Sequence, residues 1–181
     1  MRPRAARLLA AAVIIALPVA AGCGALDRTP VTVPTVTAPA VTGPQMSTAE
    51  FRSRAEAACT RLYSRLGRLG KPPTGDIGEA RRYHPAVADA WHRLLGEVGS
   101  LNAPADVSGT WGEIVEAYRA TAQNADENVL LAKTDREAIE VVNSDASARM
   151  QEAQVFMASR AADIGLRACA GAGSASAPPG G

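Results

Sequence analysis

Three cysteines are the residues of this 181-residue chain whose type and spacing predict chemistry. Cys23 directly follows an apolar leader, and Cys59 and Cys169 lie near the two ends of a long region with helical periodicity. We expect the thiol of Cys23 to be the attachment point of a lipid. In an oxidising compartment the other two thiols can form a disulfide. Neither role is catalytic.

The first 22 residues have the composition of a secretory signal, with a basic start and an apolar run that ends in small residues. The apolar run is shorter than the about 20 residues that span a bilayer. The segment Val19-Ala20-Ala21-Gly22-Cys23 resembles the lipobox of bacterial lipoproteins, except that Ala20 stands where that motif usually has Leu. The resemblance implies that residues 1–22 are removed and that Cys23 carries diacylglycerol. Ordinary secretion and an uncleaved anchor are the alternatives.

Once Cys23 is bound to lipid, Cys59 and Cys169 have only each other as partners, because an exported chain meets oxidising conditions. In the chain-entropy model, closing a loop of about 110 residues contributes on the order of 4 to 5 kcal/mol. Two independent buried thiols are the alternative to this disulfide.

The two histidines, His84 and His92, fall within one predicted helix. Asp89 and His92 are three residues apart, as in one half of a carboxylate-bridged di-metal site. Such a site needs a second helix with Glu-x-x-His and further carboxylates, and the sequence has no second copy. We therefore expect exposed polar residues here, with no metal and no cofactor.

The sequence also lacks the patterns typical of enzymes. It contains no Gly-x-Ser-x-Gly elbow and no glycine-rich phosphate loop. We therefore expect no catalytic residues and no enzyme activity. Four aromatic residues are candidates for a ligand pocket, although such residues more often fill a core; they are Tyr83, Trp91, Trp111 and Tyr118.

The composition divides the chain after the leader into three parts. Residues 23–46 are rich in Thr, Val and Pro, which favours an extended, solvated tether that could reach roughly 70 Å. Residues 47–170 are expected to form one helical domain. Residues 171–181 contain only Gly, Ala, Ser and Pro and are expected to be a disordered tail.

The charge of the chain excludes one class of partner. The leader contains three of the 19 Lys and Arg residues and none of the 18 Asp and Glu residues, so the mature chain has a formal charge of −2. We therefore expect no nucleic-acid partner. Six arginines could form a basic strip that faces anionic envelope lipid or glycan, although a solvated face balanced by Glu50 and Glu56 is the simpler interpretation; they are Arg54, Arg61, Arg65, Arg68, Arg81 and Arg82.

Apolar residues recur every three or four positions throughout the domain, which is the helical period. Ser47 and Glu50 predict a capping box at the start of a first helix, and Gly70 with the prolines after it ends that helix. A second helix is expected over residues 76–101. Pro85 lies within it and predicts a kink or a break.

A third helix is expected to begin just after Pro104. Thr134 and Glu137 predict a capping box that opens a long fourth helix, with an irregularity at residues 143–145. Its inner face is expected to hold nine apolar residues, namely Ile139, Val142, Ala146, Met150, Ala153, Phe156, Met157, Ala161 and Ile164.

These elements predict an all-α, up-down-up-down four-helix bundle. In that topology the first helix begins and the fourth helix ends at the same end of the bundle. This brings Cys59 and Cys169 together, provided that the first turns of the first helix overhang or fray. Gly165 would allow the two backbones to approach closely there.

Several short segments resemble a group of actinobacterial secreted helical lipoproteins. They are Arg54-Ala55-Glu56-Ala57-Ala58-Cys59, the mid-helix Pro85, Leu101-x-x-Pro104, and Ile164-Gly165-Leu166-x-x-Cys169. The resemblance extends from Phe51 to Cys169. It implies an exported helical bundle with paired cysteines in the first and last helices. Because that group is functionally uncharacterised, it implies no activity.

The sequence therefore predicts a cell-envelope lipoprotein, anchored through Cys23 on the outer face of the cytoplasmic membrane. We expect it to act as a non-enzymatic interaction module for an envelope protein or lipid. The alternative is a carrier for a small molecule or lipid, whose bundle opens at Pro85 around an apolar cavity of several hundred Å³.

Overall fold

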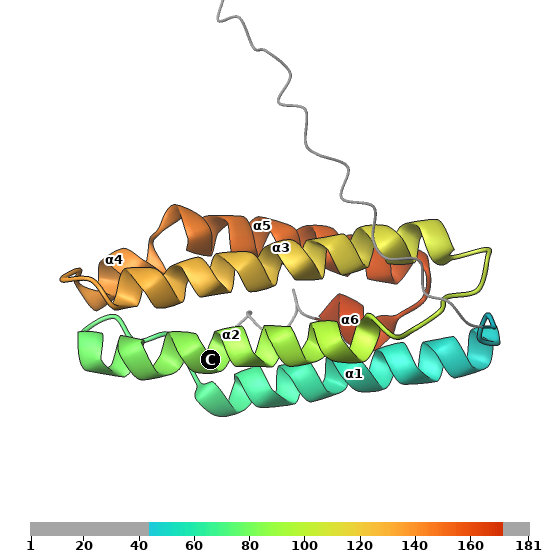
Figure 1. Cartoon of the computed structure of the whole chain (residues 1–181), viewed down its shortest axis with the longest axis horizontal. Coiled ribbons are helices and arrows are strands. Elements are labelled where there is room, and N and C mark those ends of the chain that lie inside the picture. The colour runs from blue at the N-terminus through green and yellow to red at the C-terminus, as the bar shows by residue number, and fades with distance from the viewer. Residues whose placement is uncertain (1–43, 172–181) are drawn as a thin grey trace, which may run out of the picture. The chain divides into compact units, whose positions relative to one another are not determined.

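The computed structural model describes residues 44–171, and within this range every regular element is a helix. Figure 1 shows the long helices α1, α2, α3 and α5 following one another in antiparallel order. The predicted signal peptide, Cys23, most of the tether and the tail after residue 171 lie outside the described residues. The all-α prediction is confirmed, and the helices are α1 (Thr48–Leu69), α2 (Ile77–Val98), α3 (Ser108–Ala132), α4 (Ala138–Val142), α5 (Asp145–Asp163) and α6 (Arg167–Ala170).

The ends of α1 are those that the sequence predicts. The Ser47 hydroxyl accepts a hydrogen bond from the amide of Glu50 at 3.2 Å, which satisfies one of the free donors of the first turn. Gly70 ends the helix with a φ of 75°, a left-handed conformation that favours glycine. The face between these ends is buried, and its buried residues are Phe51, Ala55, Ala58, Cys59 and Leu62.

Helix α2 is shorter than expected and is not broken. The Asp76 carboxylate accepts the amide of Gly78 at 2.7 Å and caps its start. The helix ends at Val98, three residues before the expected end at Leu101. It continues through Pro85, so of the kink or break that this proline predicted, the break does not occur.

The predicted capping box at Thr134 and Glu137 is wrong. The Thr134 hydroxyl donates to the carbonyl of Leu131 at 2.7 Å, so it closes the end of α3 and does not open a new helix. Glu137 occupies the N-cap position of α4 without a side-chain hydrogen bond to the helix. Ser and Thr hydroxyls can bond to preceding carbonyls, and here that local alternative replaces the expected cap.

The irregularity predicted at residues 143–145 is confirmed, and it separates α4 from α5. The Ser144 hydroxyl accepts the amide of Ser147 at 3.1 Å and caps α5. Asn128 of α3 is 3% exposed and bonds to both serines, accepting from the Ser144 hydroxyl at 2.7 Å and donating to the Ser147 hydroxyl at 3.1 Å. The Ser147 hydroxyl in turn donates to the carbonyl of Val141 at 3.0 Å. This network attaches the junction of α4 and α5 to α3.

The break also changes which apolar residues face inward. Ile139 and Phe156 were both expected on the inner face, but they are 38% and 43% exposed. Val141 is fully buried near the position expected for Val142, which is only partly buried. In a single continuous helix the inward-facing positions would recur with one spacing from residue 138 to 164. Two helices joined by a turn can each place a different set of positions on the inner face.

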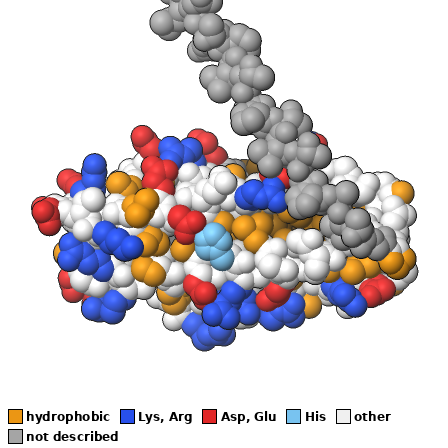
Figure 2. All heavy atoms as spheres, viewed as in Figure 1, with side chains coloured by type: hydrophobic (Ala, Val, Ile, Leu, Met, Phe, Trp, Pro, Cys, Tyr) orange, Lys and Arg blue, Asp and Glu red, His pale blue; other side chains and the backbone are white. Residues whose placement is uncertain are grey.

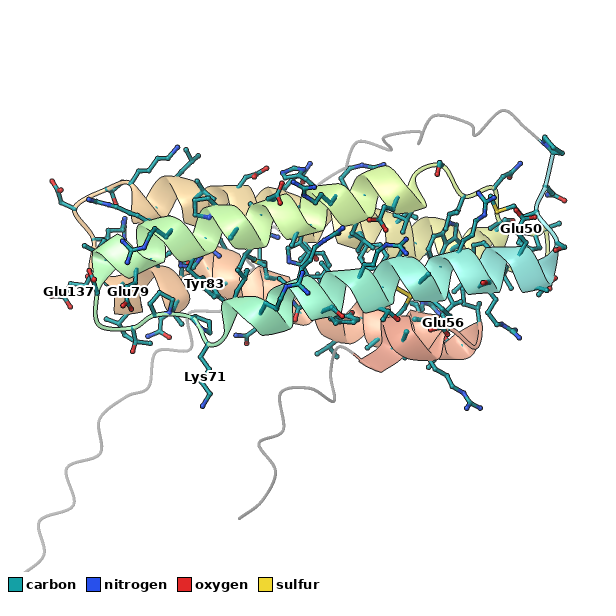
Figure 3. All side chains as sticks on the ribbon, turned by 90° about the horizontal axis from the view of Figure 1, so that it is seen from below. Glu50, Glu56, Lys71, Glu79, Tyr83 and Glu137 are labelled. Carbon is teal, nitrogen blue, oxygen red and sulfur yellow. A yellow bond between two sulfur atoms is a disulfide. The ribbon has the colours of Figure 1, made fainter. Side chains whose placement is uncertain are left out.

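The long fourth helix does not reach Cys169. It ends at Asp163, and Gly165 turns the chain with a φ of 73° so that α6 packs against α1 and α5. Figures 1 and 3 both show α6 beside α1. The role of Gly165 is therefore its left-handed conformation, because an added Cβ would meet the Arg52 guanidinium at 3.4 Å and not the backbone of α1.

Aromatic side chains fill the centre of the bundle. Phe51 and Trp111 meet edge to face with ring centroids 5.0 Å apart, and the Trp91 and Tyr118 centroids are 6.1 Å apart. All four residues are buried. Trp91, Trp111 and Tyr118 are therefore core residues, whereas Tyr83 lies only partly buried at the edge of the core.

We predict that Asn128→Ala destabilises the protein by about 1–3 kcal/mol, because it leaves the hydroxyls of Ser144 and Ser147 without their shared partner. Urea denaturation followed by circular dichroism measures the change. Gln123→Ala, at an exposed position of the same helix, is the control and should change stability by less than about 0.5 kcal/mol. Equal stability of the Asn128 variant and the wild type would show that the network does not hold the junction.

Candidate functional site

The cysteines of the described domain form the disulfide that the sequence predicts. Cys59 lies in the middle of α1 and Cys169 in α6, with their Cα atoms 5.1 Å apart. Both residues are 0% exposed. The bond therefore connects two helices inside the core, and neither sulfur is available as a nucleophile at the surface.

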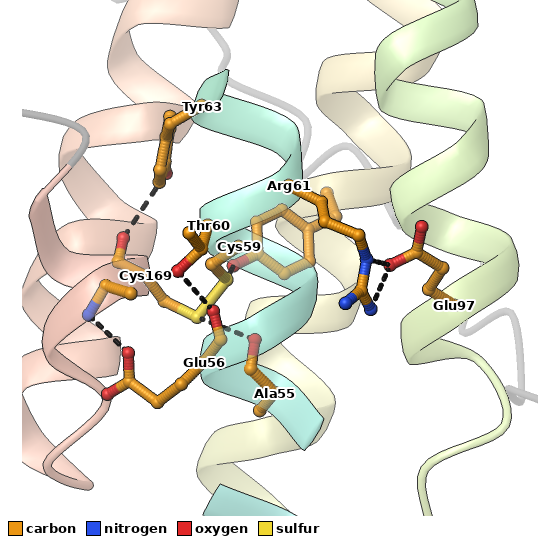
Figure 4. The surroundings of a disulfide bond; sticks show 10 residues. Ala55, Glu56, Cys59, Thr60, Arg61, Tyr63, Glu97 and Cys169 are labelled. Atoms are coloured by element: carbon orange, nitrogen blue, oxygen red, sulfur yellow. Dashed lines mark hydrogen bonds and ion pairs between the residues drawn. A yellow bond between two sulfur atoms is a disulfide. The ribbon is translucent and has the colours of Figure 1, made fainter. Parts of the chain in front are cut away.

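Two tyrosines contact the disulfide region, as Figure 4 shows for Tyr63. The Tyr118 hydroxyl donates to the Sγ of Cys59 at 3.2 Å, and the Tyr63 hydroxyl donates to the carbonyl of Cys169 at 3.3 Å. Burial raises the pKa of Tyr63 to about 12 and also raises the pKa of Tyr118, which nearby Tyr63 and Glu56 raise further. Both phenols are therefore neutral hydrogen-bond donors at physiological pH.

Glu56 adds a polar contact that sequence reasoning missed. One of its carboxylate oxygens accepts the amide of Ala168 at 2.5 Å, so it bonds to the first turn of α6 (Figure 4). Glu56 is one turn before Cys59, and Ala168 precedes Cys169. The predicted disulfide could therefore have indicated this contact, because a bond between Cys59 and Cys169 also brings Glu56 close to Ala168.

The Asp89–His92 pair does not form a site. Asp89 instead pairs with Arg93 at 2.7 Å, and that hydrogen bond lowers the pKa of the Asp89 carboxyl. His92 pairs with Asp126 of α3 at 2.9 Å, and both side chains are about half exposed. Within residues 44–171 no group of three or more His, Cys, Asp and Glu side chains is placed to hold a metal ion.

His84 is buried, although an exposed position was expected. It is 5% exposed and meets the ring of Tyr83 edge to face at 5.4 Å. Its Nε2 atom has no hydrogen-bond partner among the described residues. Burial lowers the pKa of His84, so the neutral imidazole is favoured in the folded protein.

Two grooves open on the described surface. The first, of about 340 Å³, lies between α1 and α2 and is lined by Ser53, Arg54, Ala57, Ala58, Arg61, Glu97, Ser100 and Leu101. Glu97 accepts hydrogen bonds from Arg61 at 2.7 Å and from Arg65 at 3.4 Å, and the bond from Arg61 lowers the pKa of its carboxyl. The second, of about 560 Å³, lies where α3, α4 and α5 meet and is lined by Glu127, Leu131, Arg136, Ile139, Glu140, Asn143, Ser144 and Asp145.

Comparison with known proteins gives no relative from which a role could be transferred. No family model, curated protein or solved structure matches the chain. Among the described residues, every helix is too short or too polar to be a bilayer span. The attachment residue expected at Cys23 lies outside the described residues.

We predict that the stability of the protein falls as the pH is lowered from about 7 towards 5. The unfolded chain takes up a proton on His84 near the ordinary value of 6.5, whereas the folded protein takes it up only at lower pH. The free energy of unfolding, measured by urea denaturation across this range, should therefore decrease. His84→Phe keeps a ring without a titrating group and should reduce this pH dependence.

His92→Phe, the same substitution at the exposed histidine, is the control and should retain the part of the pH dependence that His84 causes. An identical pH dependence in the wild type and in His84→Phe would contradict the prediction.

Proposed function

We propose that this protein is an exported lipoprotein, held by Cys23 on the outer face of the cytoplasmic membrane, and that it acts there as a non-enzymatic interaction module. The observation that carries this proposal is the fully buried Cys59–Cys169 disulfide. A structural disulfide forms and persists in oxidising compartments. This agrees with a leader that ends in a lipobox-like segment, in which Cys23 is the one cysteine left to receive a lipid.

The arrangement of the polar residues supports a non-enzymatic role. Asp89 and His92, the pair closest to a catalytic or metal-binding pattern, have separate partners on the surface: Asp89 pairs with Arg93, and His92 hydrogen-bonds to Asp126. The disulfide uses both cysteines of the domain, and His84 lies in the core. The groups that could do chemistry are thus paired or buried separately and do not converge on one pocket.

The interior favours the module over the carrier. Trp91 and Tyr118 are 0% exposed and occupy the centre of the bundle, near the proline at which a carrier would have to open. The two grooves described above lie at the surface and are lined in part by charged side chains, unlike the apolar cavity that a lipid carrier needs.

The surface offers apolar contacts to a protein partner. Val155 is 70% exposed, and its neighbour Phe156 is 43% exposed with the Arg160 guanidinium 5.5 Å from its ring centroid. Leu130 on α3 is 62% exposed. A photo-crosslinking residue introduced at Val155 in intact cells would therefore test this surface. The masses of the crosslinked adducts would identify the candidate envelope partners.

We predict that Cys23→Ser abolishes lipid attachment and moves the protein out of the detergent-extracted membrane fraction. The readout is the intact mass of the protein from membranes, which should include a diacylglycerol on residue 23 in the wild type. Ala57→Ser, a similar change on the surface of α1, is the control and should leave the membrane fraction unchanged.

Two results would contradict the proposal. A mature N-terminus beyond Cys23 would remove the anchor. Native mass spectrometry of the extracted protein that found a lipid or small molecule bound non-covalently in stoichiometric amount would favour the carrier.

A further inference from the structure

We infer that the face formed by α1 and α2 is a docking surface for anionic phospholipid headgroups, so that the domain lies on its membrane with α3 and α5 turned away. The inference rests on the proposed function, because the lipid anchor is what keeps the domain near that surface. It adds an orientation and a second membrane contact, made by the folded domain itself.

The first argument is the division of charge within the described domain. Residues 48–98, which contain α1 and α2, hold nine Lys and Arg residues against six Asp and Glu residues. Residues 99–171, which contain α3 to α6, hold six against eleven. The two parts therefore have formal charges of +3 and −5 although the domain as a whole is close to neutral. An anionic surface attracts the first part and repels the second.

The second argument is the position of the basic residues on α1. Arg54, Arg61, Arg65 and Arg68 follow one another at intervals of seven, four and three residues, which keeps them on one side of the helix. Arg61 and Arg65 contact Glu97 of α2, so this side of α1 is the one that faces α2. In Figure 2, Lys and Arg side chains gather along the lower edge of the molecule, where Figure 1 places α1.

The third argument is that part of this positive charge is not neutralised within the domain. Arg68 of α1 and Arg82 of α2 are exposed and make no ion pair among the described residues. Lys71, in the turn between the two helices, also lacks an ion pair within the described domain and projects away from the helices (Figure 3). Arg54 pairs with Glu50 at 2.9 Å, and the Arg81 guanidinium donates to the carbonyls of Ala132 and Thr134 at the end of α3, so neither is one of these free cations. Headgroup phosphates could therefore pair with these cations without first displacing a carboxylate.

The anchor makes a weak contact of this kind effective. Each Lys or Arg near an anionic leaflet increases affinity about fivefold, which is modest for a free protein. A tether joined to the start of α1 keeps the domain at a high effective concentration beside the lipid, so the contact does not have to be strong. The Met46 amide donates to the carbonyl of Asn102 at 3.1 Å, so the chain meets the domain at a fixed point beside the loop between α2 and α3.

The test uses the mature chain from residue 23 to 181 with Cys23→Ser, which has no lipid of its own. Co-sedimentation is measured with vesicles of phosphatidylcholine alone and with vesicles that also contain phosphatidylglycerol. We expect binding only to the anionic vesicles, and its loss at about 1 M salt, where the Debye length is about 3 Å. Equal binding to both vesicles, or binding to neither, would overturn the inference.

Matched variants identify the face. Replacing three cations of this face that make no ion pair in the described domain, with Arg68→Gln, Lys71→Gln and Arg82→Gln, should reduce affinity on the order of a hundredfold. The control makes the same change in charge on the helices that are turned away, with Arg119→Gln, Arg149→Gln and Arg160→Gln, and should keep most of the binding. Equal loss in the two triple variants would show attraction by net charge alone and would overturn the docking face.

A third variant keeps the result independent of folding. Arg68→Lys and Arg82→Lys retain the charge and should retain binding, and loss of binding with a wild-type circular dichroism spectrum would also overturn the inference. Because the chain used has no lipid, these outcomes are separate from that of the Cys23→Ser test in cells. A negative vesicle result would leave the proposed lipid anchor at Cys23 in place. A negative result of the Cys23→Ser test in cells would leave the vesicle result unchanged.

Discussion

The packing of α6 against the middle of α1 is the contact on which the rest of the described domain depends. A helix of four residues is far too short to be stable by itself, because so few hydrogen bonds cannot offset the entropy of ordering it. Here the Cys59–Cys169 bond, the Glu56 carboxylate and the Tyr63 hydroxyl all hold it in place. In turn α6 contacts both α1 and α5, so it connects the first long helix to the last one. Within this domain the disulfide has a structural role, since it is fully buried and joins α6 to the middle of α1.

We place the proposed function on the surface of the bundle. Aromatic rings occupy the centre of the described domain, where His84 is buried and its Nε2 atom has no hydrogen-bond partner among the described residues. The exposed His92 pairs with Asp126 across helices, and Asp89 pairs with Arg93 within α2. What distinguishes one face from another is charge. The side of α1 that faces α2 carries a row of arginines, whereas residues 99–171 carry eleven of the 17 Asp and Glu residues of the described domain. In an anchored protein such a division sets orientation more than affinity, because the lipid already supplies most of the attachment. A domain that lies on α1 and α2 leaves the exposed apolar residues of α5 accessible to a protein partner.

How much could be predicted from the sequence depends on how local each determinant is. Ser47 and Gly70 act through their own turns, and both ends of α1 were predicted correctly. The disulfide followed from a count, since the two thiols of a domain expected to be exported had only each other. The capping box predicted at Thr134 was wrong because the Thr134 hydroxyl can bond either forward to a new helix or back to Leu131. The sequence alone does not decide between these two hydrogen bonds. Ile139 and Phe156 were misplaced because one turn at Ser144 resets the phase of the helix. The contact of Glu56 with α6 joins residues more than 100 positions apart, and no local sequence pattern predicts it.

Amide hydrogen exchange tests the role of the Cys59–Cys169 disulfide most directly. The wild type is compared with a Cys59→Ala, Cys169→Ala variant under native conditions, and exchange is followed peptide by peptide. If the disulfide holds α6 against α1, the variant loses protection in α6 and in the turns of α1 around residue 59, while α2 and α3 remain as protected as in the wild type. Unchanged protection in α6, or an equal loss across all helices, would contradict the account.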